Sequence, residues 1–337
     1  MTALTHIDYS QFLFVSQTNF TQTYFADHKE SVSHDKINRM MRTLKLRPVE
    51  LREAVRDEVI HSPNGYIIFD DTVIEKLHAF AIESVRRQWS GNLKQVIKGI
   101  GVVTCVYVNP DLNQYWVVDY RVFDPDRDGM TKIDHLLEMW RSLIHVEQHS
   151  FRTVLMDTWY ATTQVIKQIE VDEKIYYCPL KKNRQVCESI AEGYGRVDEL
   201  QWTEEEEAQG KLVHIKKFPK GHQVKLFRLE ISTNRTDYII TNDKTQNSTD
   251  ATRQICGVRW KIEQFHREIK QVTGLKACQC RKQRAQRNHI ACAMLVWVRM
   301  SAIAQSAQTT IYQIKENLLS DYVRHELEKP TYSMARA

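Results

Sequence analysis

The sequence predicts an α/β protein whose core is a mixed five-stranded sheet with flanking helices. Three features of the chain indicate this class. Strand-like runs and helical patterns alternate over residues 61–182, the block 183–247 is rich in strands, and helical periodicity dominates residues 1–60 and 248–305. We therefore expect a small helical N-terminal domain, a core in two parts, and a β-rich insertion that interrupts the core.

Residues 1–60 are expected to form the helical N-terminal domain. The stretch HDKINRMMRTLK carries four apolar residues near helical spacing, with basic residues between them. Pro48 then begins a second helical stretch, VELREAVRDEVI, because proline is favoured in the first helical turn. Short basic helices separated by a brief break are typical of a DNA-binding module. An ordinary helical lead-in to the next domain fits the pattern equally well.

Seven elements then follow in the order β-β-β-α-β-α-β. The turn residues 62–65 precede the first strand, which ends in FDDT. The later elements are strands at 99–108 and 115–123, a helix with a Thr131–Asp134 capping box, a strand at 153–159, a helix from about 160 to 170, and a strand at 174–180. Three antiparallel strands followed by two α/β units describe an RNase H-like core, whose first part we place at residues 61–182.

Residues 183–247 are expected to form the β-strand insertion. The runs KLVHIKKF and QVKLFRLEI alternate in polarity, are joined by a PKGH turn, and are followed by a third strand, DYIITND. The acidic run TEEEE before them is expected to be a solvated turn. The chain is then helical to about residue 305, so residues 248–305 are predicted to be the second part of the core. Residues 306–337 form a C-terminal tail to which the sequence assigns no element.

The composition is that of a globular protein. The 337 residues are 42% hydrophobic and 26% charged, which is enough for a sizeable core. No run of eighteen apolar residues is present, so we expect no membrane span. The beginning, MTALTHIDYSQF, lacks the basic and apolar regions of a secretion signal. Seven scattered cysteines indicate free thiols in a reducing cytoplasm.

Positive charge is concentrated in one stretch. The net charge is +5, yet residues 259–287 hold nine Lys and Arg against two Glu, which leaves the rest of the chain slightly acidic. A basic cluster on a nearly neutral protein indicates a polyanion partner, most often nucleic acid. The alternative is a solvated helix face. The segment CRKQRAQRN, at 280–288, precedes an apolar helix and is a candidate for contact with the DNA backbone.

Two strands of the predicted core carry aspartates at the same position. The first strand leads into Asp70, Asp71 and Thr72, and the fourth leads into Asp157 and Thr158. Strands one and four are parallel neighbours in an RNase H-like sheet, so Asp70 and Asp157 should meet. Paired carboxylates repel each other unless a cation lies between them, and hard divalent ions such as Mg²⁺ prefer oxygen ligands. Capping of local turns is the alternative role for each aspartate.

A third carboxylate is available in the helix GVRWKIEQFHREIKQ. At 100° per residue, Arg259, Glu263 and Lys270 share one face beside an apolar stripe of Ile262, Phe265, Ile269 and Val272. Glu263 can therefore reach the core. Glu268 lies roughly 140° around the helix from Glu263, so we expect it on the surface, paired with neighbouring cations.

Together these residues resemble the DDE transposases of bacterial insertion sequences, in the subgroup marked Y-x2-R-x3-E-x6-K. Arg259, Glu263 and Lys270 match R, E and K, whereas Cys256 stands at the tyrosine position. Asp70-Asp71-Thr72 matches D-x-[ST] with Asp70 as the ligand, and strand alternation agrees, because Asp71 should point away from Asp70. Asp157 matches the second aspartate, and the family carries a β-strand insertion before the glutamate. The resemblance covers roughly residues 60–305.

The resemblance implies a catalytic and metal-binding set, Asp70, Asp157 and Glu263, that binds two Mg²⁺ ions with Mn²⁺ as a substitute. It assigns phosphate contacts to Arg259 and Lys270, for which salt bridges to Glu263 are the alternative. The remaining candidates for DNA binding come from the basic cluster and are Lys261, Arg267, Arg281, Lys282, Arg284 and Arg287.

The implied function is a DNA transposase that binds the ends of its insertion sequence, cleaves them, and joins the 3′-OH ends to target DNA. The implied partners are double-stranded DNA, with terminal inverted repeats and target, and a second copy of the chain in the DNA complex. The implied location is the bacterial cytoplasm, on the nucleoid. A domesticated DNA-binding protein without catalysis and an RNase H-like nuclease without strand transfer are the alternatives.

Three further motifs are weaker signals. DPDRDG, at 124–129, resembles the start of a calcium loop, but position twelve is His135 where a glutamate is required. Cys278, Cys280, His289 and Cys292 do not have a common zinc spacing. Trp202 is the single tryptophan of the insertion; we expect it to pack there, and stacking on a flipped base is the alternative.

Overall fold

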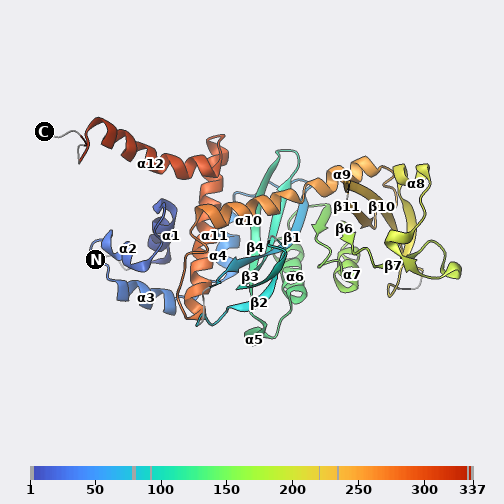
Figure 1. The fold of residues 1–337 in the computed structure, drawn as a ribbon, viewed down its shortest axis with the longest axis horizontal. Helices are drawn as coiled ribbons and strands as arrows, with labels where there is room; N and C mark the ends of the chain where they lie inside the picture. The colour runs from blue at the N-terminus through green and yellow to red at the C-terminus, as the bar shows by residue number, and fades with distance from the viewer. Residues whose placement is uncertain are drawn as a thin grey trace. The chain divides into compact units, whose positions relative to one another are not determined.

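The chain is divided into two units in the computed structural model, which describes residues 4–77, 81–91, 93–219, 221–233, 235–331 and 334 (Figure 1). Unit 1 comprises Met1–Glu58, Thr72–Val102 and Gln264–Ala337. Unit 2 comprises Val59–Asp71 and Val103–Glu263. The proposed active-site carboxylates, Asp70, Asp157 and Glu263, therefore all belong to unit 2.

Unit 1 contains the short helices that the sequence predicts before residue 60. They are α1 (His6–Val15), α2 (Gln22–Asp27), α3 (His34–Thr43) and α4 (Pro48–Val55). Thr5, Thr21 and Ser33 cap the first three, each accepting from a backbone N–H of the first turn. Helices α1, α3 and α4 pack against the long helix α11 (Gln283–Ser306), as Figure 1 shows. Whether residues 1–60 act as a separate DNA-binding domain stays a prediction.

The sequence assigns no element to the C-terminal tail, residues 306–337, but the tail contains a further helix, α12 (Ile311–Glu328). Lys315 anchors it to α1, because the Lys315 ammonium donates to the carbonyls of Leu13 (3.2 Å) and Phe14 (2.7 Å). No single helix in the described residues is long and apolar enough to cross a membrane. The bent pair α11 and α12 meets that criterion only jointly, by length and composition.

The core strands have the order that the sequence predicts. They are β1 (Tyr66–Glu75), β3 (Gln95–Asn109), β4 (Gln114–Phe123), β5 (Thr153–Met156) and β6 (Ile175–Leu180). The sheet runs β4–β3–β1–β5–β6, with β1, β5 and β6 parallel. This is the strand order of an RNase H-like core, and the predicted fold class is confirmed. Strand β2 (Arg86–Ser90), which pairs antiparallel with β3, was not predicted.

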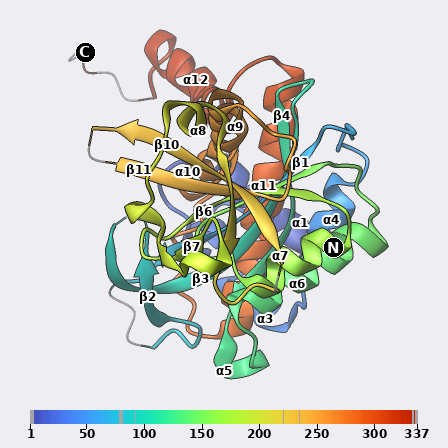
Figure 2. The same ribbon diagram turned by 90° about the vertical axis from the view of Figure 1, so that its right-hand side faces the viewer.

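Two amphipathic helices of unit 2 pack on these strands (Figure 2). Helix α6 (Lys132–Arg141) contacts β4, and α7 (Thr163–Val171) contacts β6. The predicted capping box of α6 is present: Thr131 accepts from the Asp134 N–H, and the Asp134 carboxylate accepts from the Thr131 N–H at 2.8 Å. Helix α6 continues into a π-helical turn, Ser142–Val146, and a short helix α5 (Pro125–Asp128) precedes it.

The insertion extends the same sheet instead of forming a separate one. Its strands are β7 (Gln185–Cys187), β8 (Gly195–Arg196), β9 (Lys211–Ile215), β10 (Gln223–Ser232) and β11 (Arg235–Thr241). The order continues β6–β11–β10–β9–β7–β8, because β11 pairs antiparallel with β6. The three predicted strands are confirmed as β9, β10 and β11. Lys220, in the predicted turn between β9 and β10, lies outside the described residues.

The prediction of a turn at the acidic run was wrong. Residues Glu204–Gln209 form helix α8, which packs with α9 (Thr249–Gly257) and β10. Thr203 caps α8, and the Glu206 carboxylate accepts from the Thr203 N–H at 2.9 Å. Carboxylates in a first helical turn are favoured by the helix dipole, so the clustered glutamates stabilise a helix start.

The predicted helical region 248–305 contains two breaks. Helix α9 ends at Gly257 and α10 (Trp260–Val272) follows, whereas residues 273–282 form no helix. Gly274 adopts φ +68, and a Cβ there would lie 2.4 Å from the Phe20 ring. Only glycine combines that backbone conformation with such a close approach, which ends α10 and turns the chain toward α11.

Candidate active site

The two aspartates lie side by side on neighbouring parallel strands. Phe69 of β1 is in register with Met156 of β5, so Asp70 and Asp157 are the next residues on each strand. One detail differs from the prediction. Asp157 follows the end of β5, but β1 continues past Asp70 to Glu75, so Asp70 lies within its strand. The difference arises because β1 is ten residues long and β5 only four.

The Asp70 carboxyl is in an environment that disfavours its charge. Its side chain is 17% exposed, and burial raises its pKa to about 7. The Arg259 guanidinium opposes this rise, whereas the carboxylates of Asp71 and Asp157 add to it. Asp70 accepts one hydrogen bond from the Asp71 N–H at 2.8 Å. Repulsion between neighbouring carboxylates is thus built into the site, and a bound cation would relieve it.

Asp71 faces a different set of partners, as alternation along a strand predicts. It accepts from the Lys132 ammonium at 2.6 Å and from the Tyr160 hydroxyl at 2.7 Å. Burial and the nearby aspartates raise the pKa of Tyr160 well above its usual value, so this hydroxyl keeps its proton and donates. Asp71 is therefore held in a local hydrogen-bond network, apart from the partners of Asp70.

Arg259 joins Asp70 to Glu263. Its guanidinium donates to Glu263 Oε1 at 2.7 Å and lies 3.4 Å from Asp70 Oδ2. Arg259 precedes the first residue of α10, and Glu263 lies in the first turn, so the pair has i,i+4 spacing. Of the two roles considered for Arg259, the salt bridge is present in this structure. The phosphate contact stays a prediction.

The environment predicted for Glu268 was wrong. Glu268 is only 4% exposed. Its carboxylate accepts from Gln264 Nε2 at 2.8 Å and from Trp297 Nε1 at 3.1 Å. The helical angle between the two glutamates was sound, but α11 covers the face that Glu268 occupies and supplies Trp297. Glu268 is consequently a buried hydrogen-bonding group of unit 1, whereas the Glu263 side chain is 37% exposed.

The donor chemistry of the site fits a hard divalent cation. Asp70, Asp157 and Glu263 offer carboxylate oxygens, and a cationic group, the Arg259 guanidinium, already bonds two of these carboxylates. Within the described residues, no three His, Cys, Asp or Glu side chains are gathered closely enough to enclose a metal ion. Metal binding by this set therefore requires the Glu263 and Arg259 side chains to rearrange.

The predicted DNA-binding cations have varied surroundings. Lys261 lies 5.6 Å from the centre of the Tyr115 ring, and Lys282 pairs with Glu83 at 2.7 Å. Arg281 is exposed, and neither it nor Arg284 forms an ion pair within the part of the chain that the structure describes. The remaining three differ in exposure: Arg267 is exposed, whereas Lys270 and Arg287 are partly buried.

Trp202 is partly covered within the insertion. The Lys211 ammonium lies 4.8 Å from the centre of its ring, and the indole nitrogen is buried. Lys211 is itself held by Glu188 at 2.8 Å and Glu206 at 3.2 Å. These contacts favour packing of Trp202 within the insertion, and base stacking stays a prediction.

One residue near the site, Arg235, was not predicted from the sequence. Arg235, at the start of β11, pairs with Asp237 at 2.8 Å, and the charges of Asp157 and Glu263 help to raise its pKa. A cation from the insertion thus lies within the field of two proposed ligands, and no sequence motif signals it. Cys256, at the expected tyrosine position, is half-buried near the end of α9, and burial raises its pKa to about 12.

Comparisons with known proteins match the chain to a family and to a solved structure. Residues 67–299 match the family described as transposase DDE domain. No curated protein matches the sequence. A piggyBac transposase, solved by cryo-EM in a synaptic complex with hairpin DNA, is 10% identical. That match covers 97% of this chain and 72% of the other chain, with a TM-score of 0.45.

Proposed function

Since the chain belongs to the transposase DDE domain family, we propose that it binds the ends of its own insertion sequence, cleaves them, and transfers the 3′-OH ends into target DNA. The observation that carries the proposal is the register of β1 and β5, which sets Asp70 beside Asp157, with Glu263 linked to Asp70 through Arg259. The family match spans all three carboxylates.

We assign the catalytic and metal-binding roles to Asp70, Asp157 and Glu263. When bound, two Mg²⁺ ions, or Mn²⁺ in their place, would supply an activated water or 3′-OH and stabilise the oxygen that leaves phosphorus. Regular secondary structure holds these three carboxylates in place. Asp70 and Asp157 are fixed by the parallel strands, and Glu263 lies in the first turn of α10 beside the buried residue Ile262.

Arg259 is proposed to exchange partners during the reaction. In this structure its guanidinium donates to Asp70 and Glu263. Once another cation pairs with these carboxyl groups, the guanidinium is free to bind the phosphate next to the scissile bond with its planar array of donors. Arg235 is a second cation positioned to contact DNA there, because it lies within the field of Asp157 and Glu263.

The DNA partner is proposed to be double-stranded, comprising the terminal inverted repeats and the target, and bound by a homodimer. The support for DNA binding is the basic cluster of residues 259–287. In a bacterial cytoplasm such a protein would associate with the nucleoid.

Cleavage of DNA that carries the ends of the element tests this proposal. Inverted repeats that bracket the gene would provide the substrate. Purified protein should cleave at the repeat ends with Mg²⁺, give no product with a chelator, and join the resulting 3′-OH ends to a second duplex. Asp157→Ala should bind the same DNA without cleaving it. Cleavage by Asp157→Ala at the wild-type rate would exclude the proposed site.

A further inference from the structure

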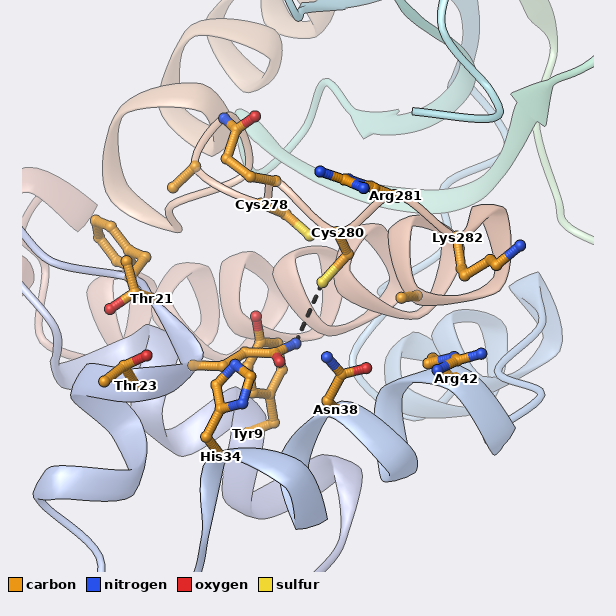
Figure 3. Close-up of a pocket in the computed structure, with 15 residues that line it drawn as sticks. Tyr9, Thr21, Thr23, His34, Asn38, Arg42, Cys278, Cys280, Arg281 and Lys282 are labelled. Atoms are coloured by element: carbon orange, nitrogen blue, oxygen red, sulfur yellow. Dashed lines mark hydrogen bonds between the residues drawn. The ribbon is translucent and has the colours of Figure 1, made fainter. Parts of the chain in front are cut away.

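A pocket in unit 1 contains two neighbouring thiols that the proposed function does not use. The pocket has a volume of about 500 Å³ and lies between the N-terminal helices and residues 277–285 (Figure 3). Cys278 and Cys280 line one wall, and His34, Asn38 and Arg42 of α3 line the other. In Figure 3 the sulfur of Cys280 points toward the wall that contains Tyr9, His34 and Asn38.

Polar contacts hold the sulfur of Cys280 in place. Gln22 Nε2 lies 3.3 Å from Cys280 Sγ and donates to it. On the other side of the segment, the buried Lys76 ammonium donates to the carbonyls of Cys278 (2.5 Å) and Lys276 (2.7 Å). The same segment is fixed by Gln286 Nε2, which donates to the Cys280 carbonyl at 2.8 Å. The two thiols therefore occupy a defined backbone conformation.

The two thiols influence each other's pKa. The neighbouring Cys278 thiol, assisted by the charge of Lys76, lowers the pKa of Cys280 to about 7 despite its partial burial. The neighbouring Cys280 sulfur, together with burial, raises the pKa of Cys278 well above its usual value. The other cations that line the pocket are Arg42, Arg281 and Lys282, with His34 as a further titratable group. Of the two, Cys280 is therefore the one that ionises more readily.

The other five cysteines do not combine partial exposure with a lowered pKa. Cys105, Cys178, Cys187 and Cys292 are buried, and Cys256, although half-buried like Cys280, has a pKa raised to about 12. A zinc site does not explain the pair either. Both ring nitrogens of His289 are engaged, one with the Tyr9 hydroxyl at 3.0 Å and one with the Gly274 carbonyl at 3.1 Å.

We propose that Cys280 and Cys278 form an oxidant-sensitive dithiol that reacts with peroxides and closes to a disulfide. The Cys280 thiolate attacks one peroxide oxygen, the O–O bond breaks, and Cys280 becomes a sulfenic acid as hydroxide leaves. The Cys278 sulfur then attacks the Cys280 sulfur, and the proton of Cys278 leaves with the displaced hydroxyl as water. The two sulfurs lose two electrons in total, which reduce the peroxide. One residue separates the two cysteines, so the disulfide closes within the segment 278–280.

Alkylation of the folded full-length chain tests the reactivity of Cys280. Limiting iodoacetamide at neutral pH, followed by peptide mass spectrometry, should label Cys280 at least about tenfold faster than Cys256, because the thiolate is the reactive form. Cys256 is the comparison thiol, because it is also partly buried but its pKa is raised. Equal labelling of Cys256 and Cys280 would overturn the proposal.

Hydrogen peroxide tests the second step on the same protein. The tryptic peptide Ala277–Arg281 contains both cysteines and should become lighter by two hydrogen atoms, with that mass restored by a reductant. In Cys278→Ser, Cys280 should instead be trapped as a sulfenic acid by dimedone, and Cys280→Ser should give neither product. Wild-type protein that yields neither the lighter peptide nor a dimedone adduct would contradict the proposal, and this result does not depend on either variant folding.

Discussion

At the scale of single residues, α10 carries two glutamates that occupy opposite environments. Glu263 is partly exposed, pairs with Arg259, and is linked through it to Asp70. Glu268 is buried and accepts from Gln264 and Trp297. Helical periodicity separated the two faces correctly but could not identify what covers each face. Trp297 lies on a different helix, 29 residues away in the chain.

Exchange of each glutamate for glutamine should therefore have opposite effects. Glu263→Gln should reduce cleavage about 100-fold or more, because a charged metal ligand is lost, and should leave DNA binding and thermal stability near wild type. Glu268→Gln should retain cleavage but lower the free energy of unfolding by about 1–3 kcal/mol, because its buried hydrogen bonds are remade less well. Cleavage kinetics and thermal unfolding of both variants measure the loss of activity and the loss of stability separately. Equal loss of cleavage in the two variants would reject the assignment of Glu263.

The raised pKa of Asp70 should appear as a dependence of stability on pH. Folded Asp70 keeps its proton up to about pH 7, whereas the unfolded carboxyl loses it near the ordinary value of 3.8. The folded state thus binds more protons between these values, so the contribution of Asp70 to stability is present at low pH and is lost as pH rises to about 7. With divalent ions removed, Asp70→Asn should lack this loss. The measurement is the free energy of unfolding by denaturant, for wild type and Asp70→Asn, between about pH 4 and pH 7. If the two proteins lose stability in parallel as pH rises, the raised pKa of Asp70 is contradicted.

At the scale of elements, local signals predicted several helix starts but not how far the strands and helices extend. The Thr131–Asp134 capping box, the Pro48 helix start and the apolar stripe of α10 are all confirmed. The extension of β1 past Asp70 was not predicted, because it depends on which strands lie beside it. The break after α10 was not predicted either, since the close approach of Phe20 to Gly274 is a tertiary contact.

The apolar stripe of α10 should be essential for the stability of that helix. Phe265 is fully buried and its ring packs edge-on against Trp297, with ring centres 4.9 Å apart. Phe265→Ala should lower the free energy of unfolding by about 3–5 kcal/mol through lost burial and a cavity. Phe265→Leu should recover most of that loss. Urea denaturation of the three proteins provides the comparison, and an unchanged midpoint for Phe265→Ala would show that α10 is not anchored through this ring.

At the scale of the whole molecule, the sequence predicted the strand order of the core and strands β9, β10 and β11 of the insertion, but not β7 and β8. It could not predict that the insertion continues the core sheet, because pairing of β11 with β6 joins segments far apart in the chain. For the same reason Arg235 was overlooked as a neighbour of Asp157 and Glu263. The three proposed ligands were selected from their motifs, and the register of β1 and β5 places two of them together.

The basic cluster should make DNA binding strongly dependent on salt. Each phosphate contact adds about 0.9 to the slope of log K against log salt concentration. Combined Arg281→Ala and Arg284→Ala should therefore reduce the slope by about 2. Arg324→Ala, which removes an exposed arginine of α12 paired with Asp321, is the control and should leave the slope unchanged. Fluorescence anisotropy with a labelled duplex at several salt concentrations decides this, and an equal slope in the double variant and the control would exclude these arginines from the interface.

The central claim is that Asp70 acts in DNA cleavage while its neighbour Asp71 serves the fold. The most direct measurement is Mg²⁺-dependent cleavage of DNA that carries the element's ends by Asp70→Asn and Asp71→Asn. The two changes remove the same charge one residue apart. Asp70→Asn should bind the DNA and give no cleavage. Asp71→Asn should cleave within about tenfold of wild type, because an asparagine oxygen can still accept from Tyr160. Wild-type cleavage by Asp70→Asn, or equal loss in both variants, would contradict the account.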